Sequence, residues 1–271
     1  PELEIATNPD ERVGSPHAFS VDKLRSYFAL QRKRFEEQLA MENWAEVFNG
    51  LTLRTAQMLA LDTAGRATSS PIPRIFLAGD WILVDDKHRS DGSTDRVCRL
   101  SDSTKQQLLA YSAFASNLAI SDPRLEPFVR TDDRWELRLL VVENGKVRPY
   151  RPHFQAQVKE CEPLPGNWAR KLVRAEGDTV FGRMIDAVSG HAVRGRHSWR
   201  YTSTLDVSAF DASWGRLRAD LEARLGLTVL TVPGFERTRR AFAPRLPPAG
   251  RQSKSAEPPV PPTGPSDAEI D

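Results

Sequence analysis

Residues 167–201 carry side chains that could together break and rejoin a phosphodiester bond. Asn167 and Arg170 stand three residues apart, and His191 follows Arg170 after 21 residues. Tyr201 lies ten residues beyond His191. An arginine can neutralise phosphate oxygens through its planar fork, a histidine can donate a proton to the reacting phosphate, and a tyrosine can act as a covalent nucleophile. The set and its order therefore indicate chemistry on phosphodiesters.

Cationic side chains farther upstream could complete such a site. Arg66 follows an apolar helical stretch over residues 44–62, for which Gly65 is the expected terminator. Lys87 stands at the turn of a predicted β-hairpin, and its neighbour His88 could contact the same phosphate. Two arginines and a histidine could compensate the negative charge that a displacement at phosphorus places on the non-bridging oxygens. We therefore expect that the reaction needs no metal.

The elements that must position these residues are predicted to be mostly helical. Apolar side chains at helical spacing predict helices over residues 21–41, 44–62, 102–119, 167–176, 181–189 and 208–225, with a short one over 154–161. Ser101 is the expected N-cap of the helix over 102–119. Within residues 72–100, β-like segments predict a small antiparallel sheet of two or three strands; 137–142 is a further strand and 121–133 a loop. The predicted fold class is α+β, mostly α, with a small antiparallel sheet.

The distribution of charge suits an anionic partner. The net charge of +2 divides into −2 for residues 251–271, which hold two basic and four acidic residues, and +4 for the rest of the chain. Arginines cluster at positions 194, 196 and 200 and at positions 237, 239 and 240, a pattern that fits a polyphosphate. A solvated surface is the alternative interpretation of each cluster.

Cysteine usage and hydropathy indicate a reducing, aqueous compartment. Cys98 and Cys161 are too far apart in the sequence to suggest a disulfide framework or a zinc site. No apolar run approaches the roughly 18 residues that span a membrane, and no signal peptide is visible. We therefore expect a cytoplasmic protein that does not contact a membrane.

In this order the motifs resemble the catalytic domain of tyrosine recombinases, the phage-integrase superfamily, over about residues 45–225. The matching segments are Thr63-Ala64-Gly65-Arg66, Asp86-Lys87 with Arg96-Val97-Cys98-Arg99-Leu100, Asn167-x-x-Arg170, Ser189-Gly190-His191 and Tyr201. The resemblance implies that Arg66 and Arg170 are the two catalytic arginines and that Lys87 protonates the leaving 5′-oxygen. It also implies that His191 is the histidine of the family's LGH motif and that Tyr201 forms a 3′-phosphotyrosyl bond.

The resemblance implies site-specific cleavage and rejoining of double-stranded DNA, as in the recombination or integration of mobile genetic elements. A tyrosyl ester that stores the bond energy would allow rejoining without ATP, so no cofactor is expected. The expected DNA-binding residues are Arg66, His88, Arg170, Arg194 and Arg196. Family members act as tetramers, so we expect a homo-oligomer or a partner recombinase on DNA, and residues 228–232 could dock on a neighbouring subunit.

Three regions are expected along the chain. Residues 1–44 form a lead-in and a helix that could be the remnant of a core-binding region. Residues 45–243 form the recombinase-like catalytic domain. Residues 244–271, rich in proline and serine, are expected to be disordered.

Three features depart from the family's pattern. Asn167 stands where the family has His or Lys, and an amide can hydrogen-bond a phosphate but cannot act as an acid or a base at neutral pH. Ten residues, rather than the more typical nine, separate His191 from Tyr201, and at most residues 1–44 represent the domains that usually precede the catalytic one. Two alternatives therefore stay open: a catalytically degenerate DNA-binding accessory protein of the same fold, and a soluble protein with no nucleic-acid role.

Each matched side chain also has a purely structural interpretation. Arg66 could interact with the carbonyls that end the preceding helix, and Lys87 could be a solubilising charge on a hairpin. Arg170 could be a surface residue of its helix. His191 could be an ordinary histidine at a helix end, and Tyr201 a half-buried packing residue.

Overall fold

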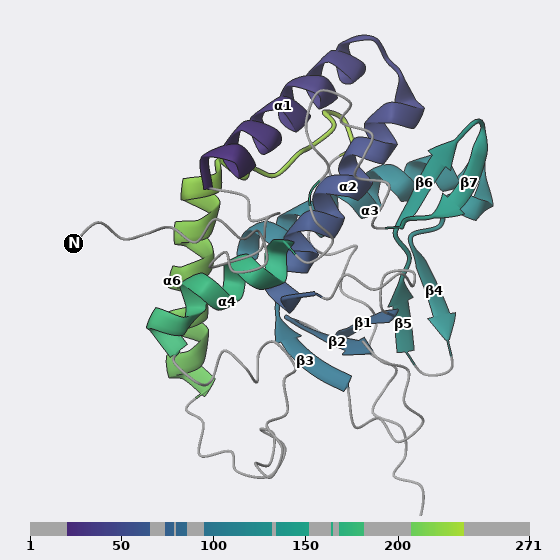
Figure 1. Ribbon diagram of the computed structural model, residues 1–271. Coiled ribbons are helices and arrows are strands. Elements are labelled where there is room, and N and C mark those ends of the chain that lie inside the picture. The colour runs from purple at the N-terminus through teal and green to yellow at the C-terminus, as the bar shows by residue number, and fades with distance from the viewer. Residues whose placement is uncertain are drawn as a thin grey trace, which may run out of the picture.

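The computed structural model describes residues 21–65, 74–78, 80–85, 95–131, 134–151, 164, 168–181 and 207–235. Within them the fold is α+β and mostly helical, as predicted (Figure 1). The α-helices are α1 (Val21–Ala40), α2 (Trp44–Thr63), α3 (Asp102–Ala119), α4 (Trp168–Phe181) and α6 (Val207–Leu225).

The helices predicted over residues 21–41, 44–62, 102–119 and 208–225 are confirmed, with small shifts of the ends. The interruption predicted at residues 177–180 is wrong, because α4 is continuous there. The bounds of α3 are those predicted, and Ser101 caps it by accepting a hydrogen bond from the Thr104 N–H. α4 continues five residues past the predicted end at residue 176, to Phe181. The predicted helix over 154–161, and residues 182–189 of the next one, lie outside the described residues.

The described strands all pair antiparallel. β1 (Arg74–Ala78), β2 (Trp81–Asp85) and β3 (Asp95–Arg99) form the three-stranded meander predicted within residues 72–100. β4 (Phe128–Thr131) pairs with β5 (Arg134–Leu137), and β5 meets β1 at two positions, which gives the strand order β3-β2-β1-β5-β4. β6 (Leu140–Glu143) and β7 (Lys146–Pro149) form a separate hairpin, with positive φ at both residues of its Asn144-Gly145 turn.

Two predictions about residues 121–142 are wrong. The expected loop over 121–133 contains a 3-10 turn, η2 (Pro123–Leu125), and strand β4. The expected strand over 137–142 is divided between β5 and β6, because the backbone changes partners at Arg138. Its N–H donates to the Pro127 carbonyl at 2.8 Å, and its carbonyl accepts a hydrogen bond from the Tyr111 hydroxyl at 2.7 Å. The partner on α3 is 27 residues away, so the local pattern carries no sign of the break.

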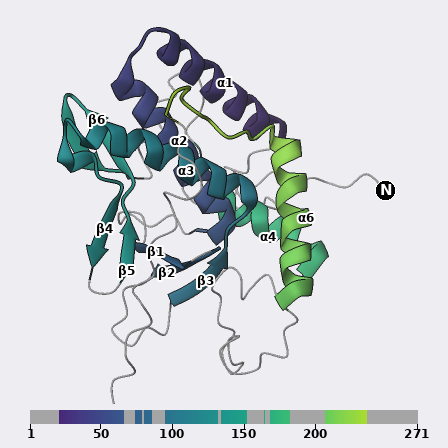
Figure 2. The same cartoon turned by 180° about the vertical axis from the view of Figure 1, so that it is seen from behind.

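Helix α2 lies at the centre of the molecule (Figures 1 and 2). Fifteen of its 20 residues are buried, because α1, α3, α4 and β6 all pack against it. The predicted apolar positions, Phe48 and Leu51 among them, are fully buried. A helix covered on every side must also bury its polar residues, and each of those needs a partner inside the protein.

The segment after α6 returns to this core. Leu227, Leu230 and Val232 are buried, and Gln107 of α3 binds the backbone of Leu230 through both ends of its amide. The sequence allowed residues 228–232 to dock on a neighbouring subunit. In this single chain the segment packs on its own protein, beside α1 and α2 (Figure 2).

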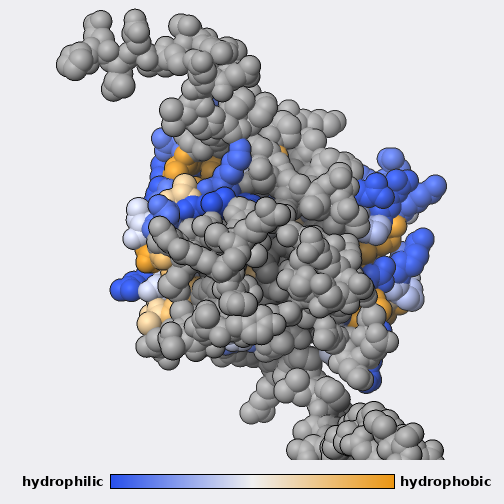
Figure 3. Space-filling view, turned by 60° about the horizontal axis from the view of Figure 1, so that its bottom comes forward, coloured by the Kyte–Doolittle hydropathy of each residue, from blue (hydrophilic) through white to orange (hydrophobic). Residues whose placement is uncertain are grey.

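The outer surface of the described residues is mixed in character. Seen from the side that is lowest in Figure 1, the described residues at both flanks show hydrophilic side chains with smaller apolar areas between them (Figure 3). The large apolar side chains that are exposed are Met41, Trp44, Ile120, Trp135 and Val180. Among the described helices, none combines the length and the hydropathy needed to cross a membrane.

Candidate functional site

The last turn of α2 leads to Arg66, the first of the predicted catalytic residues. Ala64 in this turn is fully buried and adopts the left-handed conformation, with φ 46° and ψ 45°. Its N–H donates to the Leu61 carbonyl, and the Gly65 N–H donates to the Ala60 carbonyl at 3.0 Å, which is the Schellman pattern. The left-handed residue that ends the helix is therefore Ala64, one residue before Gly65, the predicted terminator. Ala64 takes the left-handed position at a steric cost of about 1 kcal/mol.

Arg170, in the first turn of α4, points at this same turn of α2. Its side chain is buried, with the residue 7% exposed, and its Nη1 donates to the Ala64 carbonyl at 3.1 Å. Trp168 fixes the start of α4, because its ring lies 5.7 Å from the ring of Phe28 on α1. The interpretation of Arg170 as an exposed surface residue of its helix is therefore wrong. It reaches a carbonyl that stands two residues before Arg66, across 106 positions of sequence.

The other predicted site residues lie outside the described part of the chain. They are Arg66, Lys87, His88, Asn167, His191, Arg194, Arg196 and Tyr201. Several of their chain neighbours are described: Gly65 precedes Arg66, and Trp168 follows Asn167. β2 ends two residues before Lys87, and α6 begins six residues after Tyr201.

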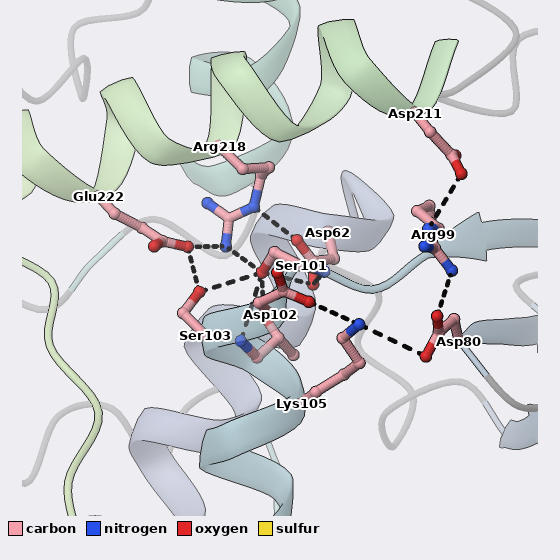
Figure 4. A network of polar contacts seen from close by, with 11 residues as sticks. Asp62, Asp80, Arg99, Ser101, Asp102, Ser103, Lys105, Asp211, Arg218 and Glu222 are labelled. Carbon is pink, nitrogen blue, oxygen red and sulfur yellow. Dashed lines mark hydrogen bonds and ion pairs between the residues drawn. The ribbon is translucent and has the colours of Figure 1, made fainter. Parts of the chain in front are cut away.

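Asp62, two residues before Ala64, forms a buried ion pair with Arg218 of α6 (Figure 4). The Asp62 Oδ1 accepts a hydrogen bond from the Arg218 Nε of α6 at 2.5 Å, and the two side chains are 0% and 1% exposed. The Asp62 Oδ2 accepts from the Ser101 N–H at 2.9 Å and from the Ser101 hydroxyl at 3.2 Å. One carboxylate therefore joins α2, the start of α3, and α6.

Glu222, one turn after Arg218 on α6, extends this network towards α3 (Figure 4). Its Oε1 lies 3.1 Å from the Arg218 Nη2 in an ion pair and accepts a hydrogen bond from the Ser103 hydroxyl. Burial raises the pKa of the Glu222 carboxyl, and the Arg218 charge and the Ser103 hydrogen bond offset only part of that rise. The charged form of this carboxyl is therefore less favourable in the folded protein than it is in water.

A second, more exposed set of ion pairs surrounds the end of β3 (Figure 4). The Arg99 guanidinium lies 3.0 Å from Asp80, in the β1–β2 turn, and 3.5 Å from Asp211 on α6. Lys105 of α3 also approaches Asp80, at 3.4 Å. Burial alone would raise the pKa of Asp80, but hydrogen bonds and charge from Arg99 and Lys105 hold it below its ordinary value. These contacts bind the meander to α3 and α6.

Neither Asp62 nor Arg218 belongs to any of the sequence motifs. One sequence signal could have indicated that Arg218 is buried. The residue stands between Leu217 and Leu221, two apolar residues of the buried face of α6. A charged side chain at such a position needs an oppositely charged buried partner. The sequence alone does not say which of the chain's carboxylates supplies that partner.

In the part of the chain that the structure describes, no group of three or more histidine, cysteine, aspartate or glutamate residues is arranged to hold a metal ion. At the end of α2, the guanidinium of Arg170 donates to the Ala64 carbonyl. Comparisons with protein-family models, with curated proteins and with solved structures found no match.

Proposed function

We propose that this chain is a tyrosine-recombinase-like enzyme that cleaves and rejoins double-stranded DNA at specific sites through a 3′-phosphotyrosyl intermediate. Tyr201 is the nucleophile, and Lys87 protonates the leaving 5′-oxygen. The scissile phosphate is bound by Arg66, Asn167, Arg170 and His191. Asn167 contributes a hydrogen bond but no proton transfer, because an amide does not titrate near neutral pH.

The contact between Arg170 and the end of α2 is the observation that carries the proposal. Two guanidinium groups can stabilise one phosphoryl transition state only if both reach the same few ångströms of space. Arg170 is buried and donates to the Ala64 carbonyl, in the turn from which the chain continues to Arg66. The contact supports a pairing of Arg170 with Arg66, because Arg66 follows Ala64 by two residues in the sequence.

The arrangement of the neighbouring elements also supports a common centre. β2 and β3 are paired with Asp85 opposite Asp95, so the segment that contains Lys87 joins two adjacent strands of the meander. α6, which follows Tyr201, is bound to α2 through the Arg218–Asp62 pair. Helix α2, which leads to Arg66, therefore contacts α4, α6 and β3, the elements that bear or adjoin the other proposed residues.

A nicked suicide DNA substrate, on which rejoining is impossible, tests the proposal. The substrate is taken from DNA that flanks the gene, and covalent protein–DNA adducts are separated on a denaturing gel. We expect an adduct with the wild-type protein and with Tyr150→Phe, which changes a different tyrosine, and none with Tyr201→Phe. An adduct with both variants would mean that another residue is the nucleophile.

A second arm tests Arg170 against a matched residue of the same helix. Arg174 is one turn further along α4 and is exposed. Arg170→Lys keeps the charge but loses the planar fork, so we expect adduct formation to slow by about 100-fold, whereas Arg174→Lys changes it little.

The alternatives give different results in the same assays. Salt-sensitive DNA binding without any adduct on a substrate that contains the site would favour the accessory DNA-binding protein. Absence of DNA binding even at low salt would contradict both the enzyme and the accessory protein, and would leave the protein with no nucleic-acid role.

A further inference from the structure

We infer that Asp62 and Arg218 are positioning residues for this site. The pair fixes the end of α2, from which the chain continues to Arg66, against the elements that adjoin the other proposed catalytic residues. The inference rests on the proposed function and adds two residues that none of the sequence motifs contains.

Asp62 binds two different parts of the protein with its two carboxylate oxygens (Figure 4). Oδ1 accepts from Arg218 on α6, the helix that begins six residues after Tyr201. Oδ2 accepts from the backbone and the hydroxyl of Ser101, two residues after β3 ends. Asp62 therefore anchors the end of the meander and α6 to the same stretch of α2 that receives the hydrogen bond of Arg170 at Ala64.

The chemistry of the pair fits positioning better than it fits stabilisation. Removing two charges from water is costly, and apolar residues of similar volume often stabilise a core as well as a buried ion pair does. Hydrogen bonds between fully buried charged groups are directional, so they specify an orientation that apolar packing leaves open. The Asp62 and Arg218 side chains are 0% and 1% exposed, and the Nε–Oδ1 distance is 2.5 Å. Their hydrogen bond therefore specifies an orientation.

The same helix offers a control pair. Arg224 of α6 donates to Glu176 of α4 through Nη1 and Nη2, at 2.7 and 3.0 Å. The two side chains are 36% and 29% exposed. This pair also joins α6 to another helix, α4, and neither of its two hydrogen bonds involves α2. Its loss should loosen α6 without changing the end of α2.

The test uses the full chain in four forms: wild type, Asp62→Asn/Arg218→Gln, Arg218→Lys and Arg224→Gln. The double variant removes both charges together, so neither is left buried and unpaired. For each form we would measure the melting temperature, the DNA affinity, the rate of adduct formation and the hydrogen exchange of amides 61–65.

We expect the double variant to form the adduct about 10- to 100-fold more slowly at nearly unchanged DNA affinity, because small displacements of catalytic groups have effects of this size. Exchange in residues 61–65 should accelerate about tenfold or more relative to the first turn of α2. Arg224→Gln should keep the wild-type values of both quantities. If the double variant does not fold, Arg218→Lys, which keeps the charge and loses the fork, is judged by the same criteria.

Two outcomes would overturn the inference. One is a folded variant that keeps the wild-type adduct rate and the wild-type exchange at residues 61–65. The other is an equal decline in Arg224→Gln at the same loss of melting temperature, because general loosening of α6 would then explain both. If the wild type itself forms no adduct, the proposed function fails. The exchange comparison then still decides whether the pair fixes the end of α2.

Discussion

Gln107 should hold the segment after α6 on the protein core. The residue lies on α3 and is fully buried. Its Oε1 accepts a hydrogen bond from the Leu230 N–H at 2.8 Å, and its Nε2 donates to the Leu230 carbonyl at 3.4 Å. One side chain thus satisfies both backbone groups of a residue that is itself buried.

The expected cost of losing this amide follows from those two contacts. A buried backbone group left without a partner costs about 1–3 kcal/mol, and the longer bond counts at the low end of that range. Gln107→Met keeps most of the volume but removes both partners, so we expect it to lower the free energy of unfolding by about 2–4 kcal/mol. Gln106→Met, one residue earlier on an exposed part of α3, should change it by less than about 0.5 kcal/mol.

Urea denaturation would measure the difference, and hydrogen exchange at the Leu230 amide would locate it. We expect exchange at Leu230 to accelerate in Gln107→Met before the rest of the protein opens, because the segment after α6 loses its anchor first. Equal stabilities of the two variants would refute the reasoning. So would a loss of stability in Gln107→Met without faster exchange at Leu230.

Two further predictions concern backbone conformation and pH. Gly215, in the middle of α6, has open space around its Cβ position, so Gly215→Ala should raise the free energy of unfolding by about 0.5–1 kcal/mol. Gly145 also has open space but a φ of +71°, so Gly145→Ala should lower it by about 1 kcal/mol in the same denaturation assay; equal signs for the two variants would contradict this. Burial raises the pKa of Glu222, so the folded state holds that proton to a higher pH than the unfolded state, whose pKa is near 4.5. The wild type should therefore lose stability relative to Glu222→Gln as the pH rises above about 4.5, and a constant or opposite difference across a pH series would rule this out.

Most helices could be predicted because the features that define a helix, its caps and the spacing of its apolar residues, are visible in neighbouring residues of the sequence. The Ser101 cap and the apolar spacing of residues 102–119 are local features, and α3 has the predicted bounds. The end of α2 shows the limit of such signals. Gly65 is the better residue for a left-handed position, yet Ala64 adopts it. The Ala64 carbonyl there accepts a hydrogen bond from a side chain 106 residues away, so this turn is shaped by contacts that no local rule includes.

The parts that the sequence did not predict are buried polar contacts between distant elements. The sequence motifs selected Arg170 because a known family has an arginine at that position. No motif contains Arg218, whose buried ion pair requires the carboxylate of Asp62, 156 residues away in the sequence. A buried arginine and a surface arginine have the same local signature until the partner is known. The set of site residues that the motifs select stays a prediction, whereas the network that connects the surrounding elements could not be predicted from local signals.

Helix α2 shows why that network matters for the site. A buried hydrogen bond has a preferred direction, so it adds to the orientation that close packing of apolar side chains already favours. Along α2, Asn49 holds β6 through both atoms of its amide. Arg54 donates to the carbonyls of Phe28 and Thr228; burial lowers its pKa to about 9, so it is still protonated at neutral pH. Asp62 then holds α3 and α6 near the end that leads to Arg66. Polar contacts thus fix β6, α1, α3 and α6 against α2, and we expect the positions of the proposed catalytic groups to depend on them.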